Sequence, residues 1–153
     1  MERIPTSKER AYYFTRIERA DEFRAPPDAA SGFGCLLWDA QGEAGTIDRG
    51  ALVQHLLEAG CGTLACGGYE CEVWHDTADE LLAALNATTW RGAERYVMTT
   101  WHTDETPAQV VFYVTDAAAV EEPAFGVYLV LQIGGANDVT DALVGAISRY
   151  AGG

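Results

Sequence analysis

The stretch Phe125–Ile133 (FGVYLVLQI) is the most apolar run in the sequence, and Gly134-Gly135 follows it directly. A continuous apolar run that ends at turn residues is typical of a buried β-strand. The apolar residues beyond the glycines recur at helical spacing: Val139, Ala142, Leu143, Ala146, Ile147 and Tyr150. This spacing predicts a helix over about 138–150, so that the C-terminal part of the chain is a strand followed by a helix.

Three similar strand-then-helix units precede this one. The predicted strands are Phe33–Trp38, Thr63–Cys66 and Arg95–Trp101, and the predicted helices span 46–60, 70–86 and 107–119. Thr46 is the expected N-cap of the first helix and Gly60 its C-terminal stop. Thr106-Pro107 is a typical start for the third helix, although its core, Val110–Val114, could also form a strand.

Four such units in series predict a three-layer α/β fold. We expect a mostly parallel sheet of four to five strands, in flavodoxin-like or Rossmann-like order, with helices on both faces. Ala11–Glu18 alternates in polarity and is expected to add an N-terminal edge strand, and Arg24–Ser31, with Pro26-Pro27, is the expected linker. The predicted organisation is an N-terminal arm, residues 1–31, followed by a single α/β domain, residues 32–153.

The charge balance is strongly acidic, with 23 acids against 10 bases and a net charge of −13. Such a surface repels nucleic acids and anionic membranes, so neither is an expected partner. Two explanations of the acidity remain. It serves solubility, or it serves docking to a basic protein partner.

The expected compartment is the cytoplasm. Residues 1–8 are polar and lack the apolar segment of a secretory signal, and no stretch approaches the roughly 18 apolar residues of a membrane span. The four cysteines, Cys35, Cys61, Cys66 and Cys71, are expected to be free thiols in a reducing compartment.

Two Trp-His pairs, Trp74-His75 and Trp101-His102, are each followed closely by acidic residues. A third tryptophan, Trp38, is followed directly by Asp39. In a flavodoxin-like order the first and third strands of the main sheet are neighbours, and ligands bind beyond their carboxyl ends. Asp39 and His102 would then flank the crevice, with Trp38 and Trp101 as its walls. The predicted binding residues are Trp38, Asp39, Trp74, Trp101, Asp104 and Glu105.

A metal site is one candidate chemistry. Thiolate and imidazole are good zinc ligands, which makes Cys66, Cys71, His75 and His102 the candidate set. Cys71 and His75 are four residues apart on one helix, but no CxxC motif occurs. Cys71 also falls on the apolar stripe with Trp74 and Ala78, where a cysteine is usually a buried core residue.

A thiol nucleophile is the other candidate chemistry. Ala65-Cys66-Gly67-Gly68 places a cysteine at a strand-to-helix turn, where a helix N-terminus can lower a thiol pKa. The arrangement resembles the nucleophile elbow of the class I glutamine amidotransferase-like families, and the resemblance implies His102 as the base. The predicted order places Cys66 and His102 two strands apart, about 10 Å, so His75 is the nearer base.

Other catalytic signatures are missing from the sequence. There is no P-loop, no GxGxxG after a strand and no GxSxG around the serines. We therefore expect a non-catalytic protein-binding module of the immunity, antitoxin or inhibitor type, which covers a basic partner and needs no cofactor. The alternative is a small hydrolase that uses Cys66, His75 and His102, either through zinc or through the thiol.

Overall fold

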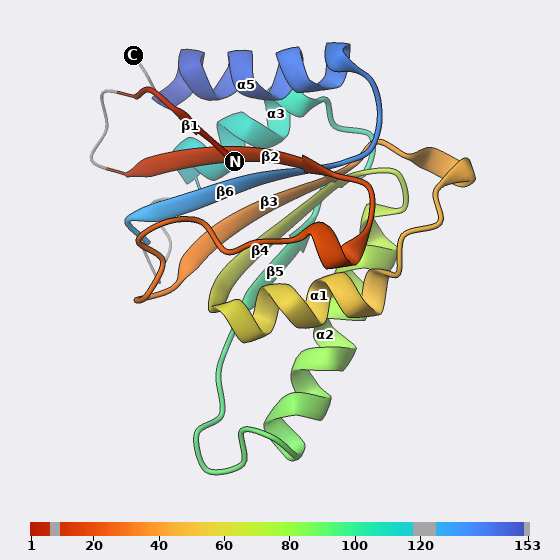
Figure 1. The fold of residues 1–153 in the computed structure, drawn as a ribbon, viewed down its shortest axis with the longest axis vertical. Coiled ribbons are helices and arrows are strands. Elements are labelled where there is room, and N and C mark those ends of the chain that lie inside the picture. Colours follow the sequence, from red (N-terminus) through yellow and green to blue (C-terminus); the bar gives the residue numbers. More distant parts are fainter. Residues whose placement is uncertain (7–9, 118–124, 152–153) are drawn as a thin grey trace.

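One six-stranded sheet runs through the part of the chain that this computed structural model describes, residues 1–6, 10–117 and 125–151 (Figure 1). The strands lie in the order β1-β2-β6-β3-β4-β5. Their bounds are β1 Glu2–Ile4, β2 Ala11–Ile17, β3 Phe33–Asp39, β4 Cys61–Gly68, β5 Met98–Trp101 and β6 Val127–Ile133. The short β1 is antiparallel to β2, and all other neighbours are parallel.

The helices cover both faces of the sheet. On one face α1 (Arg49–Ala59) packs against α2 (Cys71–Ala87), and on the other α3 (Pro107–Phe112) packs against α5 (Asn137–Ala151). Shorter helical turns are η1 (Ala20–Glu22), η2 (Gly42–Ala44) and the π-helical η3 (Tyr113–Ala117). The chain steps from β3 to β4 to β5 in one direction and returns to β6 in the other, so right-handed crossovers place α1 and α2 opposite α3.

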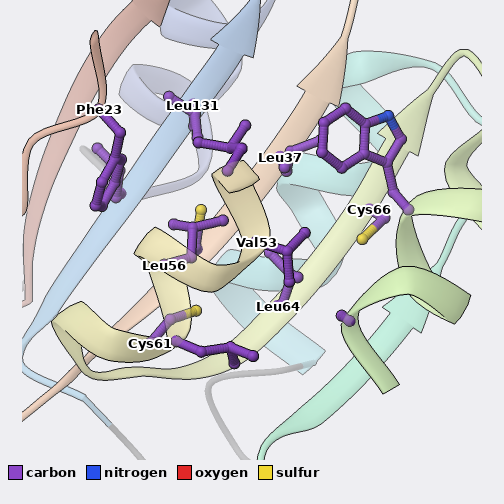
Figure 2. Packing of buried hydrophobic residues seen from close by; sticks show 14 of the residues in the cluster. Phe23, Leu37, Val53, Leu56, Cys61, Leu64, Cys66 and Leu131 are labelled. Carbon is purple, nitrogen blue, oxygen red and sulfur yellow. The ribbon is translucent and has the colours of Figure 1, made fainter. Parts of the chain in front are cut away.

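Each face has its own buried core. On the α1/α2 face, the core includes Leu37, Leu56, Leu64 and Leu131 (Figure 2). All four cysteines belong to the same core. The core of the α3/α5 face is built from Leu36, Val130, Val110, Leu143 and Ile147. Because side chains alternate along a strand, the apolar run of β6 supplies both cores at once.

The α/β class and the mostly parallel sheet are confirmed, and the sheet has six strands instead of four to five. The predicted helix over 70–86 is α2, and Gly60 ends α1 in the left-handed conformation, at φ 106°. The N-cap of α1 is Asp48, not Thr46. The segment Val110–Val114 is helical, so its interpretation as a strand is wrong.

The prediction that Ala11–Glu18 forms an edge strand is wrong. β2 is an inner strand, parallel to β6 along all seven of its residues, because the unpredicted β1 pairs with its other side. The segment expected to form an arm thus supplies two strands of the same sheet.

The flavodoxin-like neighbours are also not formed. β3 lies between β6 and β4, and β4 separates it from β5. The reason is that the crossover after β5 passes back over two strands and inserts β6 between β2 and β3.

The end of the predicted third helix, residues 118–119, lies outside the described residues. Among the helices of the described residues, none is both long and apolar enough to cross a bilayer.

Candidate functional site

The predicted site residues lie at the carboxyl edge of the sheet, but on different strands and faces. β3 ends at Asp39, β4 at Gly68 and β5 at Trp101. Since β4 lies between β3 and β5, Asp39 and His102 do not flank one crevice. The predicted pairing of these two residues is therefore wrong, for the same topological reason as the strand order.

Asp39 forms a buried pair with Trp74. The carboxylate of Asp39 is 4% exposed and accepts a hydrogen bond from Trp74 Nε1 at 3.0 Å and from the backbone N–H of Gln41 at 2.9 Å. Trp74 itself is fully buried on the inner stripe of α2. This pair ties α2 to the end of β3, which is a structural role, because a buried carboxylate needs such donors.

Trp38 is buried on the opposite face. Its ring lies over Gly67 of the neighbouring strand, where a Cβ would come within 2.6 Å of Trp38 Cε3. Gly68 has φ +80° and lies against the backbone of Asp39, where a Cβ would come within 2.4 Å of its carbonyl oxygen. The two glycines after Cys66 thus allow close packing, and the predicted rim of exposed tryptophans is reduced to Trp101, at 46% exposure.

Cys66 lies in the core and is sealed from solvent (Figure 2). Burial among apolar side chains raises the pKa of its thiol well above the ordinary value, with neighbouring Cys61 and Cys71 adding to the rise. β4 and β5 are adjacent, so Cys66 and His102 are one strand apart, not two. Their side chains point to opposite faces, because Cys66 belongs to the α1/α2 core and His102 contacts Tyr113 of η3. The geometry therefore does not form the thiol–imidazole pair.

The candidate zinc ligands are likewise dispersed. Cys71 is buried, with Sγ 3.7 Å from Thr103 Oγ1, while His75 sits one helical turn further and faces carboxylates. His102 lies on the other side of the sheet. Over residues 1–6, 10–117 and 125–151, no three His, Cys, Asp or Glu side chains are grouped so that they could hold a metal ion.

A polar cluster does form on the α2 side of β5. The Trp101 ring contacts that of His75 in a tilted arrangement, with ring centroids 4.5 Å apart and an interplanar angle of 54°. His75 Nδ1 lies 3.0 Å from Asp76 Oδ1, and its Nε2 lies 3.4 Å from Asp79 Oδ2. Asp79 also accepts a 2.7 Å hydrogen bond from Thr99 Oγ1. An exposed indole thus contacts an imidazole that is held by two solvent-facing carboxylates.

A second polar cluster lies on the α3 side of the same strand. Thr100 Oγ1 is 2.9 Å from His102 Nε2, and His102 Nδ1 is 2.7 Å from Glu105 Oε2. The His102 ring also contacts Tyr113, with ring centroids 4.7 Å apart. The Glu105 carboxylate orients the His102 imidazole ring, and the other ring nitrogen contacts the Thr100 hydroxyl. We call Asp79, Thr99, Thr100, Trp101, His102 and Glu105 the β5 edge site.

Open grooves flank this site on both sides. The groove on the α3 side has a volume of about 330 Å³, and one on the α2 side has about 470 Å³. The first is lined by Thr99, Thr100, Trp101, His102 and Tyr113. The second is lined by Asp79, Leu82, Ala83, Asn86, Glu94, Arg95, Tyr96 and Val97. Near the first, an apolar groove of about 570 Å³ includes Phe112 and Tyr150.

Trp101, His102 and Glu105 of this site are predicted by the sequence pattern, whereas Asp79, Thr99 and Thr100 are not. Asp79 is one of several acids on the outer face of α2, and no local pattern distinguishes it from a solvated residue. The available signal was the run Thr99, Thr100, Trp101, His102, which holds no aliphatic residue, because a strand with little aliphatic content is typical of a sheet edge.

The fold and this site define a mostly parallel α/β protein with a polar, aromatic site on an edge strand. Residues 14–148 match the model of the domain of unknown function DUF7684, and the chain belongs to that family. The search of curated proteins finds no match.

Proposed function

We propose that this protein is a non-catalytic binding module that covers a basic protein partner with its β5 edge site and the adjoining His75 and Asp76 of α2. The observation that carries the proposal is the exposed Trp101, whose ring contacts His75, while Asp76 and Asp79 hold the two nitrogens of that imidazole. Exposed aromatic residues are common anchors of protein interfaces. Carboxylates next to an indole favour a lysine or arginine through charge and cation–π attraction.

The wider surface supports a basic partner. Asp76 and Asp79 have side chains that are 61% and 51% exposed, and Asp104 continues the acidic surface beyond β5. Arg95, which lines the α2-side groove, lies over the Trp90 ring and is hydrogen-bonded to the Leu57 carbonyl. The net charge of −13 would steer a basic protein toward this surface. A cytoplasmic location belongs to the same proposal and is supported by the four free cysteines.

The test is to capture the partner from the source organism, purify it and measure its affinity for variants. We expect a basic protein whose affinity falls as ionic strength rises. Trp101→Ala and Asp76→Lys should each weaken binding by about ten-fold or more, as loss of a central anchor does.

Glu2→Lys is the matched control for Asp76→Lys. It makes the same charge change on an exposed residue of β1, at the opposite edge of the sheet. We expect it to change the affinity by less than about two-fold, since a remote exposed charge is screened. An acidic partner, or a partner that tolerates Trp101→Ala and Asp76→Lys, would refute the proposal.

A second candidate, ester hydrolysis, is favoured by one observation. The distances from Thr100 Oγ1 to His102 Nε2 and from His102 Nδ1 to Glu105 suit a nucleophile, its base and an orienting carboxylate. In this scheme Thr100 Oγ1 would bond to the acyl carbon while its proton passes to His102 and then to the departing alcohol. Water would release the acyl group by the same route.

Hydrolysis of p-nitrophenyl acetate distinguishes the two candidates. The enzyme proposal requires turnover by the wild-type protein that is lost in Thr100→Val, which keeps the shape of the side chain. Activity equal to that of Thr100→Val, or equal to buffer, would leave the binding proposal alone.

A further inference from the structure

We propose that the basic partner binds as an added β-strand: an extended segment that alternates basic and apolar residues pairs with the open side of β5. This inference rests on the proposed function and specifies how the partner is recognised. Edge strands carry unpaired backbone groups, and extended peptides can pair with them.

The backbone of β5 has donors and acceptors free for such pairing. The N–H of His102 donates to the Cys66 carbonyl of β4 at 3.0 Å. Because consecutive backbone groups of an extended strand point to opposite sides, Thr99 and Trp101 turn their N–H and C=O groups away from β4. Within the part of the chain that the structure describes, β5 pairs only with β4, and these outward groups have no hydrogen-bond partner.

The two sides of β5 offer different environments to an added strand. Side chains of the added strand that point to the α2 side would lie beside Asp79 and Trp101, with Glu94 further along the groove. Side chains that point to the other side meet Thr100 and the ring of Tyr113, next to the apolar groove with Phe112. The first side suits lysine or arginine, and the second suits an apolar residue. Since side chains of a strand alternate between faces, the fitting segment alternates the two types.

Charge complementarity selects this occupant over a second copy of the chain. Two copies joined at β5 would bring Asp76 and Asp79 of each copy close to the same carboxylates of the other. Like charges in such contact are unfavourable, whereas a basic segment would neutralise them.

The experiment measures binding of a short lysine–valine alternating peptide to the full-length protein by calorimetry. The informative variant is Thr99→Pro, because proline removes an N–H that points away from β4 and leaves the β4 pairing intact. Its matched control is Thr99→Val, which also loses the hydroxyl bonded to Asp79 but keeps the N–H. We expect Thr99→Pro to weaken binding by about ten-fold or more and Thr99→Val by less than about three-fold. Thermal unfolding of both variants checks that each is folded.

Modified peptides keep the test independent of the Thr99→Pro variant. N-methylation of one alternate set of peptide amides should abolish binding, and methylation of the other set should be tolerated, because only one set faces β5. A glutamate–valine peptide should not bind. The inference is overturned if no lysine–valine peptide binds, or if both methylated sets bind equally. Trp101→Ala and Asp76→Lys could weaken binding of the purified partner while Thr99→Pro leaves its affinity unchanged. That result would refute strand addition and leave the proposed function standing.

Discussion

Trp74 and Trp101 show how the same residue type serves opposite purposes in this protein. Trp74 is fully buried and donates its indole N–H to Asp39, whereas Trp101 is 46% exposed and lies over His75. The first holds α2 to the end of β3, and the second is exposed to solvent beside His75 and its carboxylate partners. A tryptophan therefore marks a binding surface only where its surroundings leave it accessible.

Trp74→Phe tests the structural half of this contrast. The change removes the hydrogen bond to Asp39 and part of a fully buried ring, so we expect a loss of about 2–3 kcal/mol in the free energy of unfolding. Urea denaturation measures it. Trp101→Phe is the matched control and should change stability by no more than about 0.5 kcal/mol, because the ring is exposed. Equal effects of the two substitutions would contradict the assignment.

The buried thiols predict a loss of stability at alkaline pH. Burial raises the pKa of Cys61 from 9.0 to about 12, with the hydrogen bond to Thr63 and the charge of Arg95 acting against the rise. Between these values the unfolded chain releases the proton and the folded chain keeps it, so rising pH favours unfolding. The contribution is fully present below pH 9 and is lost as pH approaches 12, at up to about 1.4 kcal/mol per pH unit.

Denaturation midpoints measured from pH 8 upward check this expectation. Cys61→Ala lowers the stability at pH 8 through lost packing but should reduce its dependence on pH, since one titrating thiol is gone. A pH dependence identical in the wild-type protein and the variant would show that Cys61 is not the buried thiol described.

Among the helices and strands, α1 starts at a different residue from the one that the sequence pattern predicts: its N-cap is Asp48, not Thr46. Asp48 accepts a hydrogen bond from the backbone N–H of Ala51 at 3.0 Å, while Thr46 is exposed two residues earlier. We expect Asp48→Ala to cost about 1 kcal/mol of stability, as loss of an N-cap does, and Thr46→Ala to cost little. Thermal unfolding of both variants measures the difference. A larger loss from Thr46→Ala would move the start of the helix.

Apolar periodicity predicted most elements, because burial determines which residues face the cores. The stripe of α2 and the run of β6 each extend over enough residues for their period to be clear. β1 was missed because three residues, of which only Ile4 is buried, carry no period. The strand predicted over Arg95–Trp101 is shorter, since Arg95 stacks on Trp90 and the strand starts at Met98.

The β5 edge site was less predictable than the elements that carry it. Trp101, His102 and Glu105 are close in sequence, so local pattern was enough to select them. Asp79 reaches Thr99 only because β5 lies beside α2, and that depends on a strand order which no local pattern determines. Trp38 and Trp74 are buried and not at the exposed rim where they were expected. Their burial depends on the same strand order, which the local pattern does not determine.

In the molecule as a whole, the strand order determines which strand has an edge open for pairing with a partner. β6 is inserted between β2 and β3, β1 covers β2, and β5 is left as the parallel edge with His75 and Glu105 on its two sides. The acidic surface and the open edge therefore coincide, and a basic partner would find both charge and backbone pairing there. The proposed binding role depends on this coincidence more than on any single residue.

Mapping the contact by amide hydrogen exchange tests most directly whether the open edge of β5 binds a basic partner. Amide hydrogen exchange of the full-length protein would be compared with and without its purified basic partner. If the partner binds at β5, we expect slower exchange over residues 98–105 and along the outer face of α2, with β1 unchanged. Protection confined to β1, to α5 or to the far face of α1 would contradict it.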